Sequence, residues 1–252
     1  MRVGCHTGFI LLRCCSLRPK SSSLNRAVWW LLLAASLAFA SFVTLAVYTN
    51  VSTSLTQDDI TVFESQLDLR KPLVSLTYSQ ELALIRSVQS RVWAKSPPGN
   101  GIAPYEDREP ASLLKTGNGS CYDISRTLDK AYMYLGFKSR HVYLLFRGNR
   151  TFLGALFHYG QPSHAVTEVM TSKGWLFVDS ISPWIAVTKD GEPVGADDVW
   201  KRLDAFEKPP AYLRDPWWAI RGMYSRKGQF YKPYMMFPQF SWPDFLDWLV
   251  AG

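Results

Sequence analysis

The chain has 252 residues, of which 47% are hydrophobic and 19% charged, and this balance excludes an intrinsically disordered chain. Its formal net charge is +7, but much of the excess lies in residues 1–26, which hold basic side chains and no acidic one. The remainder is only mildly basic, and we therefore expect no nucleic-acid partner.

Residues 27–48 contain no charged side chain. A helix of this length spans a hydrocarbon core of about 30 Å, and the aromatic rings of Trp29, Trp30 and Tyr48 favour the membrane interfaces at its ends. The positive-inside rule predicts a cytoplasmic basic leader over residues 1–26 and export of the rest. A cleaved signal peptide is the alternative, although both the apolar span and the leader are long for one.

Residues 49–75 are polar and weakly patterned, and we predict that they form a stalk. Thr77 and Gln80 have the spacing of a capping box, which predicts a helix that ends before Pro97. The apolar residues of this helix recur at helical spacing and are Leu82, Ile85, Val88 and Val92. The segment 96–110 is rich in proline, glycine and charge, which predicts a loop.

Cys121 follows small, flexible residues and opens a second apolar stripe at helical spacing, made by Ile124, Leu128, Ala131 and Leu135. We therefore expect Cys121 at the N-terminus of a buried helix, with Gly136 just beyond its end. It is the only cysteine after the apolar span, so it has no partner for a disulfide within the exported part. A buried, inert thiol and a reactive thiol both fit this position.

Strands are predicted at 140–147 and 152–159, joined by a hairpin turn at Gly148-Asn149. A further strand runs from His164 to Met170, and 175–179 forms the returning strand. A helix followed by antiparallel strands indicates an α+β fold.

Cys121, His164 and Asp179 provide the three groups of an activated thiol. A helix N-terminus and an imidazole both favour a thiolate, and the imidazole needs a third group to orient it. A turn that pairs Met170 with Trp175 makes Asp179 the same-face diagonal neighbour of His164, within reach of a hydrogen bond.

Four segments together resemble the transglutaminase-like superfamily: residues 119–121, 136–142, 164–169 and 175–179. They correspond to a cysteine at a helix start, a Gly–Arg segment before a strand, a His-Ala strand and a Trp-x-x-x-Asp strand. The resemblance implies a papain-like core over residues 76–195, with a Cys-bearing helix packed on an antiparallel sheet. It also implies that Cys121 is the nucleophile, His164 the general base and Asp179 the orienting group.

The sequence departs from the family pattern at Val166, where tryptophan is common. The backbone N–H of Cys121 is the expected oxyanion donor, with the Asn118 side chain as a second. Zinc bound by Cys121, His158 and His164 lacks the usual ligand spacing, so we expect no metal and no other cofactor.

Residues 196–252 form an extension rich in aromatic residues and proline, in which we predict a short helix over 199–206. Its rings are expected to complete the core. The alternative is a docking surface for the membrane interface, a partner membrane protein or a carbohydrate. We expect Arg140 and Glu168 to stabilise the fold, and His141 to be structural or exposed.

These expectations combine into a single-pass protein of the bacterial inner (cytoplasmic) membrane with a periplasmic thiol-enzyme domain. It would attack an amide or acyl carbonyl of a protein or peptide, as a protease, amidase or transamidase. A glycan on the sequon at Asn118 would crowd Cys121, which favours the bacterial periplasm over a eukaryotic secretory pathway. The alternative is a non-catalytic accessory or scaffold protein of an envelope or polysaccharide assembly and export system, with partner proteins there.

Overall fold

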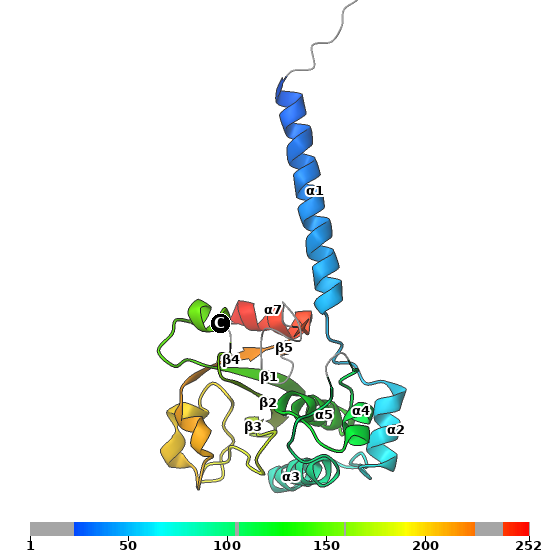
Figure 1. The fold of residues 1–252 in the computed structure, drawn as a ribbon. Coiled ribbons are helices and arrows are strands. Elements are labelled where there is room, and N and C mark those ends of the chain that lie inside the picture. Colours follow the sequence, from blue (N-terminus) through cyan, green and yellow to red (C-terminus); the bar gives the residue numbers. More distant parts are fainter. Residues whose placement is uncertain (1–22, 104–105, 159, 225–238, 252) are drawn as a thin grey trace, which may run out of the picture. The chain divides into compact units, whose positions relative to one another are not determined.

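The computed structural model describes residues 23–103, 106–158, 160–224 and 239–251. Two compact units divide the chain, residues 1–45 and residues 46–252. The first contains most of helix α1 (Ser23–Thr49), whose last turn belongs to the second unit (Figure 1). Most of the predicted basic leader lies outside the described residues.

Helix α1 matches the predicted apolar span. The span runs from Arg26 to Thr49, and its most apolar stretch has a mean hydropathy of 2.2 and no buried residue, so its length and composition suit a membrane crossing. It is the one such helix in the part of the chain that the structure describes. Which side of a membrane each end faces stays a prediction.

The second unit is built on a four-stranded sheet with the order β3-β2-β1-β4, in which every neighbouring pair is antiparallel. Its strands are β1 (Ser139–Phe146), β2 (Ser163–Thr171), β3 (Gly174–Val178) and β4 (Trp217–Arg221). Helix α5 (Cys121–Tyr134) packs on β1 and β2, and α3 (Tyr78–Lys95) packs on α5 (Figure 1). The α+β fold predicted from the sequence is confirmed.

Helix α5 forms where the sequence predicts it. Ser120 is the N-cap, and Asp123 completes a capping box by accepting hydrogen bonds from the Ser120 backbone and hydroxyl. The predicted stripe is buried, including Ile124 and Leu128, which are fully enclosed. Gly136 has a φ of +94°, which suits glycine just after a helix end.

Helix α3 also begins as predicted, because the Thr77 N–H donates to Gln80 Oε1 at 2.8 Å in a capping box. Its buried face includes Ile85, Val88 and Val92. The predicted loop that follows ends at a short helix, α4 (Pro110–Thr116).

The strand predicted at 152–159 is wrong. Residues Phe152–Leu156 form a short helix, α6, whose N-cap Thr151 accepts a hydrogen bond from the Gly154 N–H. Strand β1 has no free edge for a hairpin partner, because β2 and β4 already pair with its two sides. The β4 partner comes from far along the chain, which local patterning does not reveal.

The stalk predicted at 49–75 is also not what the structure shows. The segment contains helix α2 (Gln57–Ser65), which has a capping box formed by Thr56 and Asp59. Phe63 is fully buried, and it shares the core cluster of α3 and α5 with Val62, Leu67 and Leu69. A helix of two or three turns is too short to give a clear periodic signal.

The C-terminal extension completes the domain. Strand β4 adds an edge to the sheet, and Trp217 within it is 1% exposed. In place of the helix predicted at 199–206 there are two 3₁₀ turns, η1 (Val199–Lys201) and η2 (Leu203–Ala205). The remaining elements are η3 (Ala211–Arg214), β5 (Met223–Tyr224), β6 (Gln239–Phe240) and α7 (Trp242–Ala251). The aromatic residues among 225–238 lie outside the described residues.

Because α2 is part of the core, replacing Phe63 by alanine should lower the free energy of unfolding by about 3–5 kcal/mol. The measurement is denaturant unfolding of the full chain in detergent. Leu73 is 99% exposed and serves as the matched control, since Leu73→Ala should change stability by less than about 0.5 kcal/mol. Equal, small effects of both substitutions would restore the stalk interpretation.

Candidate active site

Cys121 is the first residue of α5 and is partly exposed. Its side chain packs against Tyr122, Ala165 and Tyr224. The backbone N–H groups in the first turn of a helix, together with the helix dipole, stabilise negative charge there. The position therefore suits a thiolate that is open to a reagent or substrate.

His164 and Asp179 meet as the predicted register requires. Met170 pairs with Trp175, and the His164 Nε2 atom lies 2.9 Å from Asp179 Oδ1. The connection is tighter than predicted, because residues 171 and 174 also pair and two residues form the turn. The loop loses one residue at each end, so its number of residues stays even. The His164 and Asp179 side chains therefore still lie on the same face of the sheet.

Asp179 is completely buried, and hydrogen bonds compensate its charge. Its Oδ2 accepts from the Ser182 hydroxyl at 2.6 Å and from the Tyr212 hydroxyl, and its Oδ1 accepts from the Ile181 N–H at 3.1 Å. Burial alone would raise the pKa of Asp179. The hydrogen bond and charge of His164, with the two hydroxyl donors, outweigh burial and lower the pKa below its usual value.

His164 has a pKa raised from 6.5 to about 9. Burial opposes this shift, but the hydrogen bonds to Asp179 and Cys121 and the negative charges of those two groups outweigh it. Since Nε2 faces Asp179, the other ring nitrogen, Nδ1, is left for the thiol. The structure thus brings the three predicted site residues together, with the imidazole between an acid and a thiol.

Two further residues support the site and were not predicted from the sequence. Tyr212, on η3, donates to Asp179, and its ring meets the His164 ring edge-on with centroids 5.1 Å apart. Gln89, on α3, donates from Nε2 to the Asp179 backbone carbonyl at 2.7 Å. Both lie far from Asp179 in the chain, and no local motif marks either of them.

Asn118 is placed close to the site helix but is partly engaged elsewhere. Its Oδ1 accepts a hydrogen bond from the Gly101 N–H at 2.9 Å. This contact holds the loop before α4 against the segment that leads into Cys121. A role for the Asn118 amide as an oxyanion donor stays a prediction, as does that of the Cys121 N–H.

His141, which we expected to be structural or exposed, is buried behind the site. Its Nδ1 lies 2.9 Å from the Ser125 hydroxyl, and its ring stacks on Tyr224 with centroids 4.1 Å apart. Burial first, and then the positive charges of Arg126 and His164, lower its pKa from 6.5 to about 3. His141 therefore remains neutral and adds no second cation beside His164.

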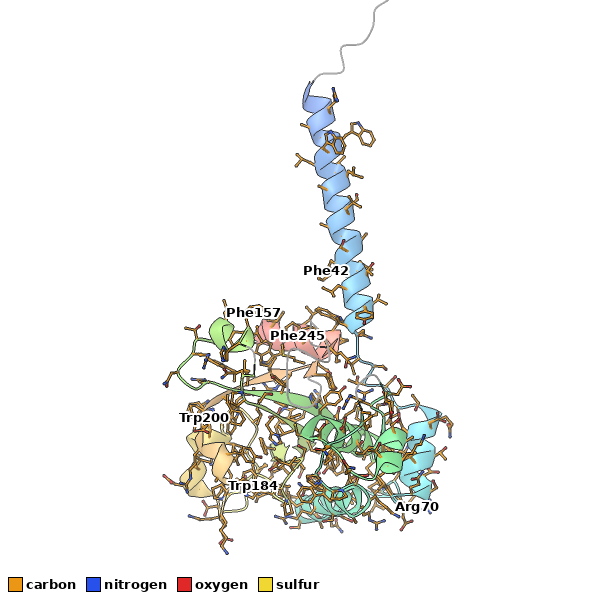
Figure 2. The ribbon with its side chains drawn as sticks, viewed as in Figure 1. Phe42, Arg70, Phe157, Trp184, Trp200 and Phe245 are labelled. Carbon is orange, nitrogen blue, oxygen red and sulfur yellow. The ribbon has the colours of Figure 1, made fainter. Side chains whose placement is uncertain are left out.

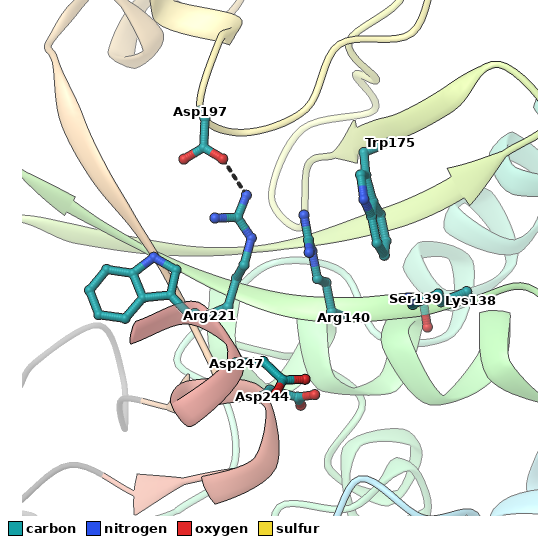
Figure 3. A pocket seen from close by; sticks show the side chains of 9 residues that line it. Lys138, Ser139, Arg140, Trp175, Asp197, Arg221, Asp244 and Asp247 are labelled. Carbon is teal, nitrogen blue, oxygen red and sulfur yellow. Dashed lines mark hydrogen bonds and ion pairs between the residues drawn. The ribbon is translucent and has the colours of Figure 1, made fainter. Parts of the chain in front are cut away.

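Glu168 and Arg140 form buried interactions that tie the sheet together, as expected of structural residues. Glu168 Oε2 accepts from Arg140 Nε at 2.7 Å and from Arg221 at 3.3 Å, which links β2 to β1 and β4. Figure 3 shows the Arg140 guanidinium flat against the Trp175 ring, at 3.7 Å from its centroid, and Arg221 bound to Asp197. These groups border a cavity of about 540 Å³.

Among the described residues, no group of three or more His, Cys, Asp or Glu side chains is arranged to hold a metal ion. Val166, at the position where the resembled family often has tryptophan, belongs to β2 and is fully buried in the core cluster that also contains Val142 and Phe177. It therefore packs within the protein and does not line the surface near the thiol.

The model of the Transglutaminase-like superfamily matches residues 73–180, a region that includes Cys121, His164 and Asp179. The chain therefore contains a transglutaminase-like domain, and the resemblance inferred from the sequence is confirmed for this region. No curated protein matches the chain. Matching solved structures include the crystal structure of a TGase, which is 12% identical, with a TM-score of 0.33. The alignment covers 65% of this chain and 42% of that one.

Replacing Tyr212 by phenylalanine should slow alkylation of Cys121 by iodoacetamide several-fold near neutral pH. The change removes one hydrogen-bond donor to the Asp179 carboxylate. The interaction that positions the His164 imidazolium is then weaker, by about 1–3 kcal/mol of free energy. Labelling can be followed by mass spectrometry of the peptide that contains Cys121. The matched control is Tyr132→Phe, which removes a buried hydrogen bond to the Ile85 carbonyl away from the site. It should lower stability without slowing alkylation, and equal slowing in both variants would contradict a positioning role for Tyr212.

The raised pKa of His164 predicts a loss of stability in alkali. A histidine whose folded pKa lies above its unfolded value stabilises the fold fully below about pH 6.5, and this contribution is lost as the pH rises through about 9. Denaturant unfolding between pH 6 and 10 should therefore show a decline in the wild-type chain that is much smaller in His164→Gln. Parallel pH profiles for the two proteins would show that His164 is not held as the imidazolium.

Proposed function

We propose that this chain is a membrane-anchored thiol enzyme that transfers or hydrolyses acyl groups through Cys121, His164 and Asp179. The observation that carries the proposal is the hydrogen bond between the His164 imidazole and the buried Asp179 carboxylate, with Cys121 at the N-terminus of α5 close enough to raise the pKa of His164. A transglutaminase-like domain over residues 73–180 supports the same class of chemistry.

In the first step, the Cys121 thiolate attacks the carbonyl carbon of an amide and forms a C–S bond. The carbonyl π electrons move to oxygen, where the backbone N–H groups at the start of α5 stabilise the charge. Collapse of this intermediate breaks the C–N bond, and the His164 imidazolium gives its proton to the departing amine. The product is a thioester on Cys121.

In the second step, His164 takes a proton from the acyl acceptor as that acceptor attacks the thioester. Water as acceptor gives hydrolysis, and an amine gives transamidation. The C–S bond then breaks and the thiolate is restored beside the imidazolium. Asp179 remains ionised throughout and keeps the imidazole in one orientation, as buried carboxylates do in related arrangements.

A cavity of about 680 Å³ supports binding of a peptide or protein segment next to this site. It is bordered by Phe146, Gln161 and Tyr212, and Tyr212 also contacts His164 and Asp179. Apolar walls with a few polar groups are typical of a cleft of this size that binds an organic ligand. We propose that the acyl-donor chain lies along this cavity.

The proposed location is the bacterial inner membrane, with α1 as the single membrane crossing, the N-terminus in the cytoplasm and the domain in the periplasm. Two features support it: the apolar character of Arg26–Thr49, and the basic residues that precede this segment in the sequence.

The test is alkylation of Cys121 by iodoacetamide from pH 5 to 9 in the full chain, compared with His164→Ala. An imidazolium–thiolate pair should react quickly near pH 6, whereas an ordinary free thiol ionises only near pH 8.5. His164→Ala should lower the rate at pH 6 by at least about tenfold. His158 is exposed and contacts Arg150, so His158→Ala serves as the matched control and should leave the rate unchanged.

A slow reaction at pH 6 that is the same with and without the His164 imidazole would overturn the proposed enzyme. Such a result would favour the accessory or scaffold role for an envelope assembly system. Detection of an imidazolium–thiolate pair would instead justify a screen of peptide amides as substrates. In that screen, Cys121→Ala must abolish turnover.

A further inference from the structure

Helices α6 and α7 expose large apolar side chains over one part of the second unit. Leu153 and Phe157 belong to α6 and the residue after it, and Phe157 is 72% exposed. Leu246, Leu249 and Val250 belong to α7, and Val250 is 89% exposed. We call these five residues the α6/α7 apolar surface.

Helix α7 carries exposed apolar side chains next to the face that packs on the domain. Phe245 and Trp248 point into the domain, where the Phe245 ring lies 4.7 Å from Phe240 and 5.7 Å from Trp248 between centroids. Leu246 and Leu249 lie beside this packed face, one and four residues after Phe245, and remain exposed. The apolar side of this helix is therefore wider than the part that the domain covers, and its uncovered part is exposed.

The two helices lie side by side. The Phe152 ring of α6 is 6.4 Å from the Trp248 ring of α7, and both helices pack in the cluster that contains Ile220. Figure 2 shows Phe157 and Phe245 on the same side of the domain, opposite Arg70. Contiguous exposed apolar side chains of this kind mark a surface that another apolar phase covers.

The end of the apolar span is fixed to the start of α7. Trp242 donates from Nε1 to the Ala46 carbonyl at 2.9 Å, and the Val51 N–H donates to the Phe240 carbonyl at 2.6 Å. Ala46 and Val51 both belong to the second unit, and the apolar span ends between them at Thr49. The place where the chain would leave a bilayer is therefore the place where α7 begins.

We propose that the α6/α7 apolar surface docks on the same bilayer that α1 crosses, with its side chains buried at the boundary of headgroups and acyl chains. The proposal rests on the membrane anchor of the proposed function. Helix α7 has ten residues and so extends only about 15 Å from its attachment to the end of the span. Its exposed apolar stripe thus remains within reach of the membrane surface, as in helices that lie in the interface.

The charges around the surface fit this arrangement. Arg150 and His158 lie beside α6 and are exposed, where they can meet lipid phosphates. On α7, Asp244 and Asp247 line the cavity bordered by Arg140 and Arg221, as Figure 3 shows. The two carboxylates of α7 therefore lie at this cavity, beside the α6/α7 apolar surface.

The test places a fluorescent label on the full chain in liposomes of phosphatidylcholine. In a background in which Cys5, Cys14, Cys15 and Cys121 are serine, a single cysteine at a chosen position carries a nitrobenzoxadiazole group. At Leu249→Cys and, independently, at Phe157→Cys, the emission should shift to the blue and be quenched several-fold by lipids that carry a nitroxide near the headgroup. The matched control is Leu73→Cys, which is also an exposed leucine of the same unit and should show neither effect.

A label at Phe39→Cys, within α1, separates failure of the anchor from failure of the docking. Quenching at Phe39 by deeply placed nitroxides without quenching at Leu249 or Phe157 would overturn the docking and leave the anchor intact. Absence of quenching at Phe39 would overturn both. A third outcome is a blue shift at Leu249 that is not quenched by the lipids and that disappears when the protein is diluted in the membrane. This result would mean that a second copy of the chain covers the surface, and it would also overturn the proposal.

Discussion

The structure of the site depends on one buried interaction, the hydrogen bond between His164 and Asp179. Both groups are removed from water, and a buried charge that loses its partner costs several kcal/mol. The protein offsets this cost with two hydroxyl donors to the carboxylate, Ser182 just after β3 and Tyr212 on η3. Gln89 on α3 donates to the Asp179 backbone carbonyl and so fixes the position of the residue. The pair is thus held from three directions, which fixes the imidazole face that remains for Cys121.

The folded domain extends on both sides of the region that resembles the transglutaminase-like superfamily. Before it, α2 supplies Phe63 to the main core, and after it β4 closes the edge of the sheet next to β1. A buried ion pair joins α2 to α5, because the Lys130 ammonium binds Asp59 at 2.8 Å. The helix that bears the thiol is therefore positioned in part by residues of α2, which lie outside the matched region 73–180.

Local signals predicted the parts of the site that are close in sequence. Small residues before Cys121, followed by the α5 stripe, located the helix start, and strand parity placed Asp179 beside His164. The same reasoning failed at Phe152–Leu156, where Thr151 caps a helix and the edge of β1 is already occupied. Tyr212 could not be predicted, because a tyrosine 33 residues from Asp179 reaches it only through the tertiary fold.

The position of β4 and Tyr212 late in the chain has a consequence for biosynthesis. Cys121, His164 and Asp179 leave the ribosome first, but β1 keeps an unpaired edge until residues 217–221 are made. The Asp179 carboxylate likewise lacks its Tyr212 donor until η3 is made. Domains fold as units as their chains are completed. A nascent or truncated chain that stops before η3 would thus carry the thiol but lack the Tyr212 hydrogen bond and β4. The site is therefore complete only after the end of the domain has been synthesised.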